Sequence, residues 1–238
     1  MIGGIEDVPD DFQEYAVTLD NVSKIYAGDG GDDCALNDLS LGVRRGRFCV
    51  VMGAARSGKT TLLECMAGTV RPSSGTVRWG AEEVGAIGLL GADDELPDEG
   101  TVHDFVSKGK SGTAFSDREL QNAFRVVRLW ARRRRVRDLS PIQLKKARVA
   151  RVLAASPRLV LVDEPTGRNW EEDARVLGDI MRKAVRTLKV TAVMATRDPV
   201  AASRADSVVF LRDGCLVDAI ANASADEIKD CMKSINAR

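Results

Sequence analysis

Residues 53–60 read GAARSGKT, which has the spacing G-x-x-x-x-G-K-[ST] of a phosphate-binding loop. An apolar run, FCVVM, precedes them, and a segment of helical character, KTTLLECMAG, follows. In this order the backbone N–H groups of Ser57, Gly58 and Lys59 surround a β-phosphate at the helix N-terminus. We expect the Lys59 ammonium to reach the β- and γ-phosphates and the Thr60 hydroxyl to bind Mg²⁺. We expect the following residues to contact the ligand: Gly53, Ala54, Ala55, Arg56, Ser57, Gly58, Lys59, Thr60 and Thr61.

Two adjacent carboxylates end a second apolar run, LVLVDEP. Asp163, at the tip of a buried strand beside the phosphate loop, is expected to hold Mg²⁺ through water. Glu164 is expected to polarise the attacking water. An Asp-Glu pair after an apolar strand is common in proteins. It indicates a catalytic site here because a phosphate loop accompanies it.

A third position of interest is Arg197, which ends the apolar run KVTAVMAT. An arginine stabilises the charge of a phosphate, but it cannot transfer a proton or change tautomer as a histidine does. The alternative is a solvated side chain in a loop. The residues alone therefore leave open whether the chain only binds a nucleotide or also hydrolyses it.

The segments that carry these motifs alternate between strand and helix periodicity. YAVTLDNVSKIY and LNDLSLGVRRGRF predict strands of an antiparallel sheet, and SSGTVRWG, RLVLVD and VTAVMAT predict further strands. DRELQNAFRVVRLW, KKARVARVLAA and EEDARVLGDIMRKAVRTL have helical spacing, and SVVFLRDGCLVD predicts a hairpin that turns at Asp213-Gly214. Strands that alternate with helices predict a mainly parallel sheet covered by helices.

The composition limits the class of protein. The chain has 238 residues and is 44% hydrophobic, which suits one globular domain with a real core. Basic and acidic residues are equal in number, so no overall field attracts the chain to nucleic acid. No apolar run approaches the ~18 residues that span a bilayer, and the acidic N-terminus differs from a signal peptide. Five dispersed cysteines and a single histidine predict reduced, mostly buried thiols, a cytoplasmic location and no zinc site.

With LSPIQLKKARVARVL just before the acidic motif, the two phosphate-binding motifs resemble the ATP-binding subunits of ABC transporters. The segments EPTG and IGLLGADDELPDEGTVHDFV are most similar to the branch of lipoprotein release, macrolide-type export and cell division. The resemblance implies an α/β fold: a P-loop NTPase core of the RecA-like type with an antiparallel β subdomain and a helical subdomain. It also implies ATP and Mg²⁺ as cofactors and two domains that close head to tail around two ATP molecules to drive an integral membrane permease.

The resemblance assigns roles to three further positions. Tyr26, in VSKIY, matches the aromatic residue that stacks on adenine, although an apolar residue at a strand end is an alternative. Ser140, in LSPIQ, matches the helix start that caps the γ-phosphate of the opposite subunit. Arg197 occupies the position of the family's histidine.

Other positions depart from the family pattern. Ala92 replaces a glutamine that contacts Mg²⁺ and the permease-facing surface. Pro141 and Ile142 replace two glycines, so one N–H is lost and a branched side chain stands where backbone must approach phosphate. Arg56 replaces a glycine of the phosphate loop, and Trp170 or a neighbour lies where an aspartate is expected after EPTG. The basic run RRRR at residues 132–135 is a solvated helix face or a contact for lipid head groups or an acidic permease loop.

These observations predict a peripheral subunit on the inner face of the plasma membrane, in a homodimer or in a heterodimer with a second ATP-binding subunit. We expect residues 12–222 to form the ABC ATP-binding domain, with a helical subdomain at 93–145, and residues 223–238 to form a tail. We expect hydrolysis to be slow. Glu164 is retained, but several residues that should assist it are replaced. The alternative is a nucleotide-gated regulatory subunit of a membrane complex with little or no hydrolysis.

Overall fold

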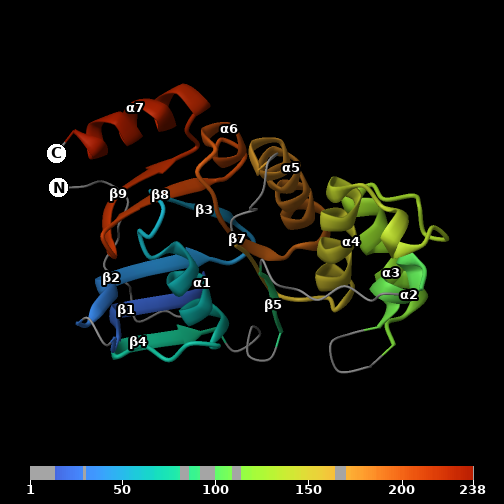
Figure 1. Ribbon diagram of the computed structural model, residues 1–238, viewed down its shortest axis with the longest axis horizontal. Helices are drawn as coiled ribbons and strands as arrows, with labels where there is room; N and C mark the ends of the chain where they lie inside the picture. The colour runs from blue at the N-terminus through green and yellow to red at the C-terminus, as the bar shows by residue number, and fades with distance from the viewer. Residues whose placement is uncertain are drawn as a thin grey trace.

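Two sheets and seven α-helices organise the part of the chain that the computed structural model describes, which is residues 14–28, 31–80, 86–91, 100–108, 114–163 and 170–237 (Figure 1). The strands are β1 (Tyr15–Tyr26), β2 (Asp33–Arg44), β3 (Phe48–Met52), β4 (Ser74–Trp79), β5 (Ile87–Leu90), β6 (Leu159–Val162), β7 (Thr191–Ala195), β8 (Ser207–Arg212) and β9 (Cys215–Ala221). The helices are α1 (Lys59–Ala67), α2 (Val102–Ser107), α3 (Asp117–Val127), α4 (Pro141–Ala154), α5 (Trp170–Leu188), α6 (Pro199–Ala202) and α7 (Ala225–Asn236).

The larger sheet has the order β5-β6-β7-β3-β8-β9, in which β9 alone runs antiparallel to its neighbour. The smaller sheet, β2-β1-β4, is antiparallel, and α1 lies between the two sheets (Figure 1). Helices α2, α3 and α4 form a lobe beside the β5 edge, which we call the helical lobe. This confirms the expected α/β fold with an antiparallel sheet and separate helices.

Strand β3 is buried along its whole length because both faces of the larger sheet are covered. Phe48, Val50 and Met52 pack on the face covered by α4 and α5. Cys49 and Val51 point to the opposite face and pack against α1 and the smaller sheet. The phosphate loop follows directly on this strand, so its first residue starts from a rigid point.

Two features, the basic run and the cysteines, differ from the sequence expectations, and the short helix α6 is one that the sequence does not predict. The basic run 132–135 is a turn after α3 and not a helix face; its backbone pairs with the start of α2, where the N–H of His103 donates to Arg132 O (2.9 Å). The segment after Arg197 forms the short helix α6, because the Asp198 carboxylate caps it. Of the five free cysteines only Cys49 and Cys65 are buried, so the thiols are less buried than expected.

Burial raises the pKa of the Cys49 thiol to about 11. Such a thiol stays protonated at neutral pH and is chemically inert.

Among the described helices, none combines the length and apolar character that a membrane-spanning segment needs.

Helix α3 begins with a charged capping box. The backbone N–H and hydroxyl of Ser116 donate to Glu119 Oε2 at 2.8 and 2.7 Å, and these hydrogen bonds lower the pKa of the Glu119 carboxyl. Helix α4 has the same arrangement with a neutral residue, Gln143, in place of the glutamate. Since the folded-state pKa of Glu119 is depressed, its ionisation stabilises the fold above the unfolded-state pKa, and this contribution is lost as pH falls through the folded-state value.

We therefore expect Glu119→Gln to retain the cap but to lose part of the acid sensitivity. The free energy of unfolding of the variant should fall less steeply than that of the unaltered protein as the pH falls below the ordinary glutamate pKa of 4.5. Urea denaturation at several pH values measures this. Parallel curves for the two proteins would contradict the role of the charge.

Candidate nucleotide-binding site

The turn between β3 and α1 has two glycines that no larger residue can replace without movement. A Cβ atom on Gly53 would lie 2.4 Å from both Leu211 O and Ser57 Oγ. Gly58 has φ +98°, and a Cβ there would lie 2.3 Å from Ala35 O. Both glycines of the motif therefore serve the close approach of backbone to neighbouring segments.

The ammonium group of Lys59 lies inside this turn. Its Nζ donates to Gly53 O at 2.9 Å and to Ala54 O at 2.7 Å, and its side chain is only 6% exposed. The turn thus surrounds a buried positive charge at the start of α1, where backbone N–H groups add to the positive potential. This is the electrostatic arrangement that binds an anion.

The hydroxyl of Thr60 donates to Asp163 Oδ2 at 2.9 Å. These two residues are far apart in the sequence, at the first turn of α1 and just after β6. The position of Asp163 is fixed by its own N–H, which donates to Leu90 O at 2.9 Å. The structure therefore brings together the hydroxyl and the carboxylate that the sequence assigns to a metal ion.

A hollow of about 400 Å³ lies over the phosphate loop, and it contains both Tyr26 and Arg197. The described side chains that line it carry three cations, Arg56, Lys59 and Arg197, against one carboxylate, Asp33. Its lining consists of Tyr26, Asp33, Ala35, Ala55, Arg56, Ser57, Gly58, Lys59, Thr60, Thr61 and Arg197. A cationic hollow with an aromatic side chain at its edge fits an anionic ligand with a planar ring.

Tyr26 ends β1 and is 38% exposed, and Lys24 Nζ lies 4.8 Å from its ring centroid. This is a cation–π contact, which leaves the other face of the ring to a ligand. Asp33 and Ala35 also line the hollow, although sequence reasoning does not identify them. They belong to β2, whose pattern indicates a strand but not its position beside the phosphate loop.

Arg197 is exposed, but the backbone on both sides of it is fixed. The N–H of Thr196 donates to Val51 O at 3.1 Å. Asp198 is 3% exposed and accepts from Ala201 N at 2.7 Å and from Arg175 Nε at 3.2 Å. The guanidinium therefore starts from a well-defined point at the rim of the hollow.

Arg56 has φ +65°, a left-handed conformation. Such a conformation costs roughly 1–2 kcal/mol for a residue with a side chain, and glycine adopts it freely. The phosphate loop therefore carries backbone strain at Arg56.

Other expected site residues lie elsewhere. Ser140 is exposed at the start of α4, where its Oγ accepts from Gln143 N at 3.4 Å, and it is not part of the lining of the hollow. Glu164 lies outside the described residues, as do Ala92 and Asp93, the neighbouring carboxylate that could take the place of the missing glutamine.

Comparison with known proteins identifies the family. The ABC transporter family model matches residues 36–167. The phosphonates import ATP-binding protein PhnC of Hyphomonas neptunium is 30% identical over 220 residues, which cover 82% of this chain and 83% of that protein. The macrolide export ATP-binding/permease protein MacB 1/2 of Paracoccus denitrificans is 33% identical, over 84% of this chain and 33% of that protein.

Comparison with solved structures agrees on the fold. The dimeric, post-hydrolysis structure of the ATP-binding cassette MJ0796 with ADP and Pi matches with a TM-score of 0.70 at 22% identity. The match covers 87% of this chain and 99% of that one.

The close contacts of Gly53 lead to a stability prediction. Gly53→Ala should lower the free energy of unfolding by about 1–3 kcal/mol, because its methyl group would clash with backbone and with Ser57. Gly91→Ala is the matched control, since a Cβ there meets no atom of the described residues within 4 Å. It should change stability by less than about 0.5 kcal/mol. Urea denaturation measures both, and equal effects would contradict the close approach at Gly53.

Proposed function

Because the chain belongs to the ABC transporter family, whose ATP-binding domains dimerise and act with permeases, we propose that it binds Mg-ATP in the hollow over the phosphate loop. The observation that carries this proposal is the hydrogen bond between Thr60 and Asp163 beside the enclosed Lys59. It supports a site for phosphate and metal together, not for phosphate alone.

We propose a distinct role for each part of the hollow. The N–H groups of residues 57–59 and the Lys59 ammonium bind the β- and γ-phosphates. Tyr26 stacks on the adenine ring through its free face. Arg56, whose side chain lines the hollow, adds a further positive charge near the phosphates. The remaining loop residues, Gly53, Ala54, Ala55 and Thr61, keep the loop in shape.

The residues present fit Mg²⁺. This ion prefers oxygen ligands and is commonly held by one or two carboxylates together with substrate phosphates. Thr60 and Asp163 provide a hydroxyl and a carboxylate oxygen. Among the described residues no group of three or more acidic, histidine or cysteine side chains forms a metal cage, in agreement with such a shared site. The bound ion would neutralise charge that develops on the phosphates.

We propose that hydrolysis is slow. Glu164 is the candidate general base, but Arg197 replaces a histidine and cannot accept a proton near neutral pH. Loss of one preorganised group at a reacting centre typically lowers the rate by ~10²–10³. Arg197 retains the ability to stabilise negative charge at the rim.

The start of α4 is also altered. Pro141 is tolerated at the first helical position because that N–H is not needed by the helix. The N–H of Gln143 is already bonded to Ser140 Oγ. Of the N–H groups of residues 141–143, only that of Ile142 then remains to bind a phosphate of the opposite subunit. The branched side chain of Ile142 lies beside this N–H. We propose that Ser140 still caps that phosphate, but weakly.

We propose that the chain forms a homodimer or pairs with a second ATP-binding subunit, and that the dimer binds an integral membrane permease at the cytoplasmic face of the plasma membrane. We divide the chain into an ABC domain at 12–222, a helical subdomain at 93–145 and a tail at 223–238. The tail contains α7, whose Ile228 and Ile235 are buried in the core.

A regulatory role is the second candidate, favoured by Arg197 and Pro141. In that case ATP-driven dimerisation is the signal, and hydrolysis contributes little. The rate of ATP hydrolysis in the presence of the permease separates the two roles.

Lys59→Ala should weaken the binding of a non-hydrolysable ATP analogue with Mg²⁺ by roughly 100-fold or more, because the phosphates lose their enclosed cation. Lys229→Ala removes the same charge from an exposed position on α7 and is the control. Equilibrium titration measures both variants. Similar affinity in the Lys59 variant and in the unaltered protein would refute the phosphate site.

The replaced residues lie in both parts of the proposed ATP site, which two subunits form together. We therefore predict that the effects of restoring the two parts on the ATPase rate depend on each other. Each ATP in such a dimer contacts one subunit's phosphate loop and the other's α4 start. The isolated protein should turn over well below the ~1–100 s⁻¹ typical of phosphoryl transfer. Ala92→Gln with Arg197→His, or Pro141→Gly with Ile142→Gly, should each raise the rate in part.

Combination of the two pairs should lower the activation free energy by more than the sum of the separate effects, because both act on one transition state. Steady-state ATPase rates across this double-mutant cycle provide the measurement, and Glu164→Gln should remove the activity throughout. Full recovery from either pair alone, or simple additivity, would contradict the composite site.

A further inference from the structure

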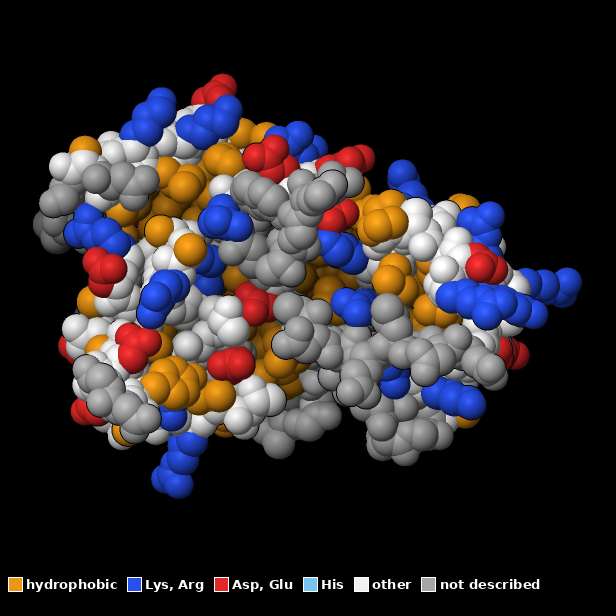
Figure 2. Space-filling model, viewed as in Figure 1, with side chains coloured by type: hydrophobic (Ala, Val, Ile, Leu, Met, Phe, Trp, Pro, Cys, Tyr) orange, Lys and Arg blue, Asp and Glu red, His pale blue; other side chains and the backbone are white. Residues whose placement is uncertain are grey.

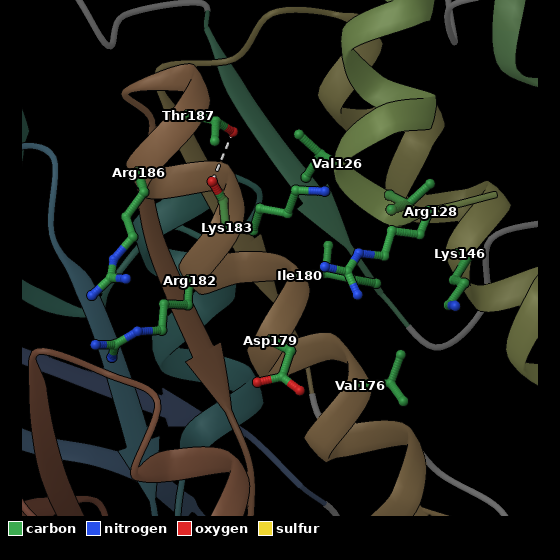
Figure 3. A pocket seen from close by; sticks show the side chains of 11 residues that line it. Val126, Arg128, Lys146, Val176, Asp179, Ile180, Arg182, Lys183, Arg186 and Thr187 are labelled. Carbon is green, nitrogen blue, oxygen red and sulfur yellow. Dashed lines mark hydrogen bonds between the residues drawn. The ribbon is translucent and has the colours of Figure 1, made fainter.

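A second hollow, of about 530 Å³, lies where the end of α3 and α4 meet the side of α5 (Figure 3). Its apolar lining includes Val126, Val127 and Ile180, which are buried. Five basic side chains surround it: Arg128, Lys146, Arg182, Lys183 and Arg186. One carboxylate, Asp179, lines it. Over the same lobe, the surface in Figure 2 has more Lys and Arg than Asp and Glu side chains.

Three of these cations come from three different helices. Arg128 follows α3, Lys146 stands on α4 and Lys183 on α5. Figure 3 shows Arg128 and Lys183 extending into the space between α5 and the helical lobe, whereas Arg182 and Arg186 point away from that lobe. The convergence is therefore a result of tertiary packing and not of a run in the sequence.

The described part of the chain does not neutralise this group of cations. Asp179 already accepts from Arg204 Nε at 2.7 Å. Among the described residues no carboxylate forms an ion pair with Arg128, Lys146 or Lys183. Partial burial, and then the charges of Arg128 and Arg125, lower the pKa of the Lys183 ammonium. An anion bound between Arg128 and Lys183 would offset the repulsion between these two cations.

The backbone at Arg128 is in the left-handed region. This residue ends α3 with φ +52°, and its N–H donates to Phe124 O. Glycine occupies this left-handed position at the least cost. Lys189 has a similar left-handed backbone (φ +60°), so it can serve as a matched control for the strain at Arg128.

We propose that this hollow binds a compact anion with two or more phosphate groups or a phosphorylated lipid headgroup, held by Arg128, Lys146 and Lys183. The occupant would link the helical lobe to α5 and would stabilise their relative position. Arginine suits this task because its planar guanidinium makes paired hydrogen bonds to phosphate oxygens. The site is separate from the phosphate loop, which is lined by other residues.

The test uses Arg128→Gly, which removes the cation and relieves the strained backbone, so the fold is retained. Lys189→Gly is the matched control: Lys189 is exposed, has φ +60° and does not line the hollow. All proteins also carry Lys59→Ala, which minimises phosphate binding at the loop. The probes are inorganic tripolyphosphate, by calorimetric titration, and phosphatidylglycerol vesicles compared with phosphatidylcholine vesicles, by co-sedimentation.

We expect Arg128→Gly to weaken binding of at least one probe about tenfold, and Lys189→Gly to change it less than twofold. Lys183→Gln, which retains a donor for Arg125 O, should weaken it similarly. If Arg128→Gly weakens binding of tripolyphosphate only, the ligand is soluble. If it weakens binding of anionic vesicles only, the ligand is a lipid headgroup. If neither probe binds saturably, or if Lys189→Gly weakens binding as much as Arg128→Gly, the proposed site is wrong.

Discussion

The turn between β3 and α1 is held by the close approach of its backbone to two other segments. Gly53 lies against Leu211 at the end of β8, and Gly58 lies against Ala35 in β2. The N–H of Gly214, in the β8–β9 hairpin, donates to Ser57 O. The turn can therefore direct its N–H groups and Lys59 toward one point only because both sheets support it. Its geometry depends on the packing of the larger sheet, with β3 buried on both faces.

The same packing explains how distant residues reach the hollow. Strand β3 lies beside β7, so the chain that leaves β7 places Arg197 next to the phosphate loop. Strand β6 lies on the other side of β7, and Asp163 at its end meets Thr60. The smaller sheet contributes Tyr26 from the end of β1. A parallel sheet gathers strand ends at one edge, and this edge gathers the residues of the site.

At three positions where we expect a departure from the family pattern, the local backbone geometry is well accommodated by the fold. Arg56 adopts the left-handed backbone that glycine would adopt, and Pro141 occupies a helical position that needs no N–H. Arg197 stands on a backbone fixed by Thr196 and Asp198. Each change is therefore compatible with the fold.

The sequence by itself determined the phosphate loop, the hairpin at Asp213-Gly214 and the strands and helices around them. These depend on local rules: left-handed residues in turns, periodic burial, and a helix that starts just after a loop. Only the tertiary structure decided that Tyr26, Asp33 and Arg197 line one hollow, and that Arg128 and Lys183 face each other across another. The order of strands and the packing of α3, α4 and α5 bring these residues together. Such contacts between distant segments arise from the burial of shared apolar faces, which no local spacing records.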